Sequence, residues 1–95
     1  MSNVVIIGGN ECMVCRYQEI CKKEGYKAKV FAKENGPMKK KIGCPDLMIL
    51  FTGTVSHKMM ICATQEAKKN QVPVLHVHSS SASALQQALD AHIAQ

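Results

Sequence analysis

The stretch from Pro45 to Lys58, PDLMILFTGTVSHK, decides the fold. It begins with five consecutive apolar residues, Leu47 to Phe51, and passes through Thr52-Gly53-Thr54 into a helical pattern. A run that is apolar at every position is typical of a strand covered on both faces, which in a short domain is the centre of a parallel sheet. Open α/β sheets bind ligands beyond the carboxyl ends of their strands, so the same stretch predicts where the site lies.

The rest of the chain supplies the partners of that strand. Short apolar runs predict strands at residues 3–7, 26–31 and 72–77, and apolar stripes predict helices at 11–23, 57–70 and 83–94. A turn at 35–37 and a short helical turn at 38–42 are also expected. Because strands alternate with helices, the crossover rule predicts a parallel four-stranded sheet in the order 2-1-3-4. We expect residues 1–95 to form one small Rossmann-like or flavodoxin-like α/β domain of three layers, with strand 26–31 at a sheet edge.

Composition narrows the classes of function. The 95 residues carry 12 Lys and Arg against 7 Asp and Glu, and the net charge of +5 favours anionic partners. Nucleic acid is disfavoured, because the two Phe and two Tyr are not interleaved with the basic residues as a stacking platform requires. No long apolar span and no signal-peptide pattern is present, so we expect a cytoplasmic protein that does not enter a membrane.

Three loops are predicted to meet at the carboxyl edge of the sheet. They follow the first, third and fourth strands and contain glycines, hydroxyl side chains and helix starts, all of which suit a phosphate or carboxylate. The same serines and threonines also suit ordinary helix caps, and that alternative stays open. The candidate ligand-binding residues are Gly8, Gly9, Asn10, Thr52, Thr54, Ser56, His57, Lys58, His78, Ser79, Ser80 and Ser81.

Five cysteines in a chain without an export signal favour thiol or metal chemistry over a disulfide framework. Cys12 and Cys15 form a CxxC motif at the start of the first helix, where the helix dipole favours thiolates. A dithiol redox pair, half of a metal site and coincidence all remain open for this motif. Cys44 precedes a proline and can present a thiolate to heme iron, although a cysteine placed in a turn by chance is the simpler interpretation. Cys21 and Cys62 fit the apolar faces of their helices and are expected in the core.

The histidines suggest a second kind of metal site. His76 and His78 are two apart in the fourth strand, so they share a face, and His57 stands at a helix start. Cys12, Cys15, His57 and His78 together would supply the four ligands of a zinc ion. Histidines hydrogen-bonded at a sheet edge are the simpler alternative.

Four motifs, GGN, KAKVF, PDLMILFTGTVSHKM and HSSSASAL, together resemble a small bacterial family catalogued as a domain of unknown function. The likeness runs along nearly the whole chain. It implies a short cytoplasmic Rossmann-like protein without an established enzymatic activity, and it carries a link to heme binding through a cysteine thiolate. Other members are expected to differ at Cys12, which leaves Cys15 and Cys44 as thiolates that act singly.

We therefore expect a protein that binds heme b through a cysteine thiolate for sensing, storage or delivery, not for enzymatic turnover. The loops can hold the propionates, and the apolar plate suits methionines such as Met13, Met59 and Met60. Because the domain is small for a porphyrin, we expect a homodimer that shares the cofactor. The alternatives are a thiol redox module using Cys12 and Cys15, a binding module for a phosphorylated small molecule at the three loops, and zinc or no cofactor in place of heme.

Overall fold

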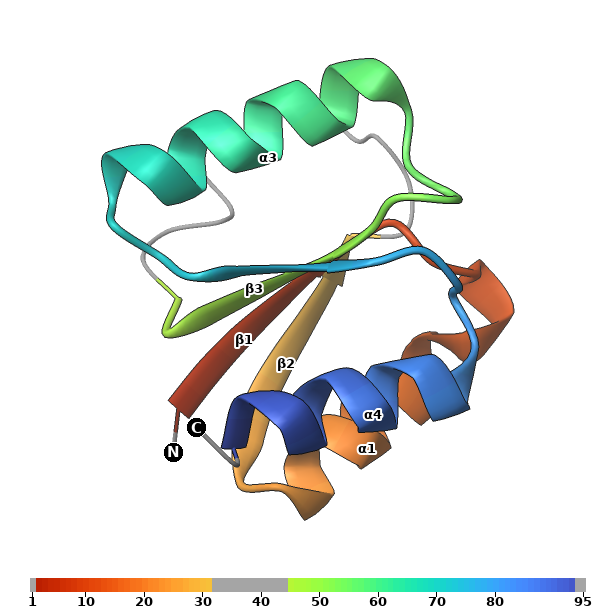
Figure 1. Cartoon of the computed structure of the whole chain (residues 1–95). Coiled ribbons are helices and arrows are strands. Elements are labelled where there is room, and N and C mark those ends of the chain that lie inside the picture. The colour runs from red at the N-terminus through yellow and green to blue at the C-terminus, as the bar shows by residue number, and fades with distance from the viewer. Residues whose placement is uncertain (1, 32–44, 94–95) are drawn as a thin grey trace.

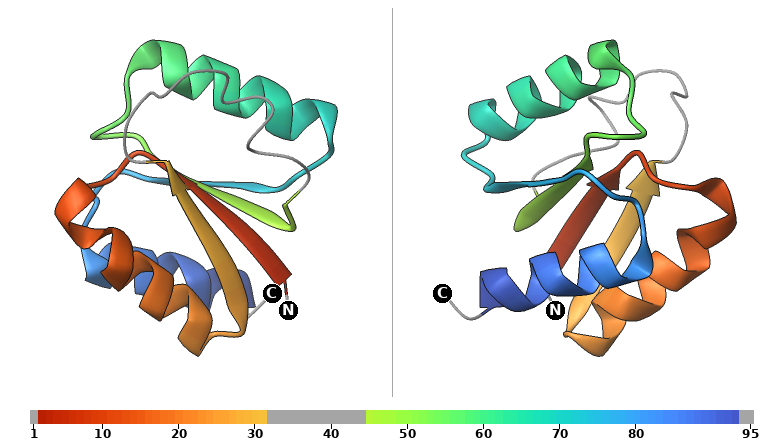
Figure 2. Two further views of the ribbon diagram at one scale, coloured as in Figure 1. Left: turned by 180° about the vertical axis from the view of Figure 1, so that it is seen from behind. Right: turned by 45° about the vertical axis from the view of Figure 1, so that its right-hand side comes forward.

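Four parallel strands lie between two layers of helices in the structure, a computed structural model that describes residues 2–31 and 45–93 (Figure 1). The strands pair in the order β2-β1-β3-β4, and their bounds are β1 Ser2–Ile7, β2 Tyr26–Phe31, β3 Leu47–Phe51 and β4 Val74–Val77. The helices are η1, a 3-10 turn at Glu11–Met13, α1 Val14–Lys23, α3 His57–Lys69 and α4 Ala82–Ile93. Helices α1 and α4 cover one face of the sheet and α3 covers the other (Figures 1 and 2). The predicted three-layer α/β fold and strand order are confirmed.

Strand β3 is the centre of the core, as its unbroken apolar run predicts. All five of its residues are 0% exposed. Leu47, Ile49 and Phe51 belong to the apolar cluster that includes Leu85 and Leu89 of α4. Met48 and Leu50 belong to a second cluster that includes Met59, Ala63 and Ala67 of α3. Successive residues of a strand point to opposite faces, so β3 divides its side chains between the two helical layers.

Strand β2 lies at one edge of the sheet. It pairs with β1 alone among the described strands. Lys27 and Lys29 are exposed, whereas Ala28 and Val30 pack against the cluster on the α1 side. This alternation confirms the edge position, because a strand at the centre would be covered at every residue.

Some element bounds differ from the prediction. Strand β4 begins at Val74, not Val72, because Pro73 has no N–H to donate, although its carbonyl accepts a hydrogen bond from Met48 N at 2.9 Å. The first helix opens with the 3-10 turn η1 before α1 begins. The turns expected at 35–37 and 38–42 lie outside the described residues. Within residues 2–31 and 45–93, no helix has the length and apolar character needed to cross a membrane.

A tight turn of two glycines follows β1. Gly9 has a φ of +93°, in the left-handed region that side chains disfavour. A Cβ on Gly9 would lie 2.9 Å from Cε2 of Tyr17 and 3.1 Å from Cδ2 of Phe51. The turn therefore needs glycine both for its backbone conformation and for the rings packed against it.

We expect Gly9→Ala to lower the free energy of unfolding by about 3 kcal/mol, since it combines left-handed strain with overpacking. Gly25→Ala is the matched control, because Gly25 has a φ of +84° but nothing within 4 Å of the added Cβ. Strain alone predicts a loss of about 1 kcal/mol there. Urea denaturation of both variants measures the difference, and equal losses would show that the ring contacts do not matter.

Candidate functional site

The loops that follow β1, β3 and β4 lie side by side at the carboxyl edge of the sheet. The N–H of Gly9 donates to Thr54 Oγ1 at 2.8 Å, which joins the first loop to the second. The N–H of Gly53 donates to the carbonyl of His78 at 3.2 Å, which joins the second loop to the third. A Cβ on Gly53 would lie 2.5 Å from that carbonyl oxygen, so this approach requires glycine. The edge is a connected surface, built from three parts of the chain.

The β1 loop uses its polar groups to start the first helix. Gly8 is buried, and its N–H donates to the carbonyl of Phe31 at 2.9 Å. The exposed Asn10 accepts from Cys12 N at 3.0 Å through its Oδ1 and from Met13 N at 2.9 Å through its carbonyl. Asn10 therefore satisfies N–H groups at the start of η1, which is the role of a helix cap.

Tyr17 connects the first loop to the third from beneath. Its ring is fully buried and lies 5.2 Å from the ring of Phe51, centroid to centroid. Its hydroxyl donates to the carbonyl of Ser80 and accepts from Asn10 N at 3.2 Å. The sequence analysis included Tyr17 only within the helix predicted at 11–23 and missed this role. The available signal was its phenol, because a buried tyrosine hydroxyl requires a hydrogen-bond partner.

Several hydroxyl groups at this edge hold the loops and the helix starts. Ser56 Oγ accepts from Met59 N at 3.2 Å and caps α3, while Ser81 Oγ accepts from Ala84 N at 3.2 Å and caps α4. Ser79 Oγ accepts from Ser81 N at 3.3 Å. These bonds match the capping alternative of the sequence analysis. Each serine hydroxyl keeps its own hydrogen free to donate, so an anion at this edge remains a prediction.

Three other candidate side chains at this edge make no hydrogen bond that fixes their position. His57, Lys58 and His78 are exposed, and none of their side chains has a hydrogen bond or ion pair to another part of the described chain. Thr52 is half-buried, and its N–H donates to the carbonyl of Val77 at 2.9 Å, which extends the β3–β4 ladder. Lys58 is therefore a cation that this edge presents to solvent.

The thiols fall into two groups according to the face of the helix that carries them. Cys12 and Cys15 are exposed and free. Cys21 is buried in the core, and the loss of water around it raises its pKa to about 11. Cys62 is half-buried against the cluster on the α3 side. The expected core position of Cys21 is thus found, whereas Cys62 packs at the margin of the core and Cys44 lies outside the described residues.

The four residues considered for zinc are not assembled into a ligand set. Among residues 2–31 and 45–93, no three His, Cys, Asp or Glu side chains come close enough together to hold a metal ion. Cys12 and Cys15 lie by α1, on one side of the sheet, whereas His57 begins α3 on the other (Figure 1). Cys12 and Cys15 thus start a helix on one face of the sheet, and His57 starts a helix on the other face.

The methionines proposed for a cofactor surface differ in their exposure. Met59 is 5% exposed and belongs to the core beneath α3, so it is not available to a ligand. Met60 and Met13 are half-buried, and the sulfur of Met13 lies 3.9 Å from the hydroxyl of Tyr17. Only Met13 and Met60 of the three offer part of their surface.

Comparison with known proteins supports this architecture. A family model described as an uncharacterized protein conserved in bacteria (DUF2325) matches residues 3–92. The lactose-specific IIB component domain of the phosphoenolpyruvate:carbohydrate phosphotransferase system from Streptococcus pneumoniae is similar in structure, with a TM-score of 0.62 over 98% of this chain and 95% of that chain. The two sequences are 11% identical, so the likeness shows the fold alone. No curated protein matches the sequence.

We expect Tyr17→Phe to loosen the carboxyl edge while leaving the ring packing in place. The variant removes the donor to Ser80 and the acceptor for Asn10 N, and the lost bonds predict a fall in unfolding free energy of about 2 kcal/mol. Hydrogen exchange at the Asn10 amide should accelerate. Tyr26→Phe is the control, since the half-buried Tyr26 has no hydroxyl bond within the described residues. Similar losses of unfolding free energy in both variants would show that the hydroxyl bonds of Tyr17 do not hold the carboxyl edge together.

Proposed function

The chain belongs to the DUF2325 family of bacterial proteins, and on this premise we propose that it binds heme b through a cysteine thiolate. The observation that carries the proposal is the exposure of two free thiols, Cys12 and Cys15, at the start of the first helix. Heme iron accepts a single thiolate as an axial ligand. When bound, heme supplies an iron whose ligands and oxidation state can change, which suits sensing, storage or delivery.

Cys15 is the first choice as the ligand, with Cys12 and Cys44 as the other candidates. Cys15 is exposed on α1, so its thiol can reach an iron without any rearrangement of the core. Cys21 is unsuitable, because it is buried and its raised pKa of about 11 keeps it protonated at neutral pH. The helix thus offers one exposed and one buried thiol, six residues apart.

Other groups at the carboxyl edge fit the rest of a heme. Lys58 is exposed and has no partner in the described part of the chain, so its charge suits a propionate. The half-buried Met13 offers a polarizable apolar contact beside Cys12. A porphyrin lying across this edge would have its outer face in water. We therefore propose that a second copy of the chain covers it in a homodimer.

Absorption spectra of single cysteine variants test this function. The protein should be purified from cells supplied with heme precursors, and it should show a Soret band that shifts on reduction and on carbon monoxide addition as thiolate ligation requires. Cys15→Ser should lose that spectrum. Cys62→Ala is the control and should keep it, because Cys62 lies half-buried on the opposite helical layer.

Two outcomes would overturn the heme proposal. One is a colourless protein that also fails to take up added hemin. The other is an unchanged spectrum in all three single variants Cys12→Ser, Cys15→Ser and Cys44→Ser. Loss of the spectrum in Cys44→Ser alone would instead move the ligand to Cys44 and leave the function intact.

A thiol redox module is the second candidate, because the same two exposed thiols are three residues apart. Cys12 lies in η1 and Cys15 in the first turn of α1, and side chains three apart on such turns are neighbours. In this function the two thiols give two electrons and two protons to a disulfide oxidant such as oxidised glutathione. A Cys12–Cys15 bond forms, and the oxidant is released as two thiols.

Mass mapping after treatment with oxidised glutathione tests the redox candidate. We expect a Cys12–Cys15 disulfide that a thiol reductant reopens, while Cys21 stays unmodified because it is buried and its pKa is raised to about 11. Cys15→Ser should form no internal disulfide. If both thiols can still be alkylated after this treatment, the redox function fails.

A further inference from the structure

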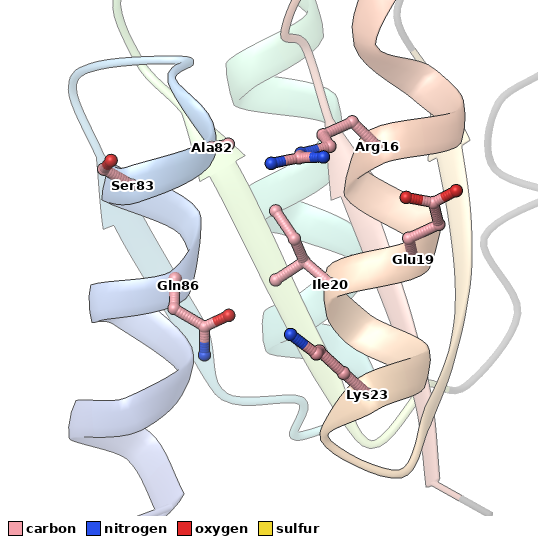
Figure 3. A pocket seen from close by; sticks show the side chains of 7 residues that line it. All are labelled: Arg16, Glu19, Ile20, Lys23, Ala82, Ser83 and Gln86. Carbon is pink, nitrogen blue, oxygen red and sulfur yellow. The ribbon is translucent and has the colours of Figure 1, made fainter.

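A hollow lies between α1 and α4, the two helices that cover one face of the sheet. Its volume is about 440 Å³ (Figure 3). Both helices line it, and the residues are Arg16, Glu19, Ile20, Lys23, Ala82, Ser83 and Gln86. None of them belongs to the candidate site at the three loops. We call this hollow the α1–α4 groove.

Two cations from α1 converge on this groove. The side chains of Arg16 and Lys23 both extend from α1 toward α4, whereas the carboxylate of Glu19 points away from α4 (Figure 3). Neither cation has an ion pair or hydrogen bond to any other residue that the structure describes. Surface cations usually extend into water, so two unpaired cations reaching over one hollow are an arrangement that favours an anion.

The middle of the groove and its wall on α4 are formed by uncharged side chains. Ile20 lies between Arg16 and Lys23 and is 9% exposed, so it offers a small apolar floor. Gln86 Nε2 donates to Glu24 Oε1 and to Asp90 Oδ1, each at 3.0 Å, and these bonds hold the amide in place. The carbonyl oxygen of Gln86 faces the groove (Figure 3).

The spacing of the cations limits what can bind both. Arg16 and Lys23 are seven positions apart on α1, which corresponds to about 10 Å along the helix axis. Ile20 lies between the two side chains (Figure 3), so a single phosphate or carboxylate bound by both cations would have to sit over this apolar residue without any apolar contact to offer it. An elongated ligand with an anionic group at each end satisfies both cations and places its middle on Ile20.

We propose that the α1–α4 groove binds an organic dianion whose two carboxylate or phosphate groups are separated by an apolar segment. Arg16 holds one end, Lys23 holds the other, and Ile20 contacts the segment between them. The proposal uses no cysteine, so it stands whether or not the protein binds heme.

Suberate, an aliphatic dicarboxylate, is the probe for this groove. In an NMR titration of the whole protein, suberate should produce saturable shifts at the amides of Ile20, Ser83 and Gln86. Octanoate has the same chain length and one carboxylate, and inorganic phosphate has no apolar segment. We expect both to bind at least about fivefold more weakly than suberate, because each lacks one of the contacts.

Variants that each remove one positive charge then test whether Arg16 and Lys23 both bind suberate. Arg16→Gln and Lys23→Gln should each weaken suberate binding about fivefold, and the double variant should abolish the saturable shifts. Lys22→Gln is the control, since it removes one charge from the same helix outside the groove and should change affinity less than about twofold. These side chains are exposed, so the variants are expected to fold, and their amide spectra check this directly.

Three results would overturn the proposal. The first is the absence of saturable shifts with suberate. The second is a loss of suberate binding in Lys22→Gln as large as in Lys23→Gln, which indicates screening of the exposed lysines by a nonspecific anion. The third is phosphate binding as tight as suberate binding, in which case the apolar segment has no role.

Discussion

Strand β3 must be covered on both faces at once, and the arrangement of every other element follows from this. Its five residues are fully buried, with alternate side chains in the two apolar clusters. Each such side chain contributes about 2 kcal/mol, so the strand accounts for roughly 10 kcal/mol of apolar burial. That is comparable to the net stability of an entire domain. A helical layer on each side is therefore a requirement of the sequence, and β1 and β4 complete its pairing.

The burial of one polar group links this core to the candidate site. Tyr17 packs its ring against Phe51, the last residue of β3, and its hydroxyl then needs partners that no apolar neighbour provides. It finds them in Ser80 and Asn10, in two different loops. The buried hydroxyl of Tyr17 therefore helps to fix the positions of the loops at the carboxyl edge. Tyr17 is thus one side chain through which the core supports the site.

The side of helix α1 on which a cysteine lies decides whether its thiol is exposed or buried. Cys15 and Cys21 lie on the same helix, yet one is exposed and the other is buried with a pKa raised to about 11. The apolar stripe formed by Tyr17, Ile20 and Cys21 faces the sheet, so a thiol off this stripe faces water. The same orientation of α1 turns Arg16 and Lys23 toward α4. Thiol reactivity and the cationic groove both follow from how α1 docks on the sheet.

The sequence by itself determined the layers, the edge position of β2 and the burial of Cys21, because each depends on local periodicity, and the crossover rule added the strand order. It also placed the helix caps Ser56 and Ser81 near helix starts. Only the tertiary structure decided which polar groups meet, such as Tyr17 with Ser80, 63 positions apart. It also put the helices that begin near Cys12 and at His57 on opposite faces of the sheet and formed the groove between α1 and α4. Periodicity is a property of neighbouring residues, whereas these pairings depend on distances between segments that no local pattern encodes.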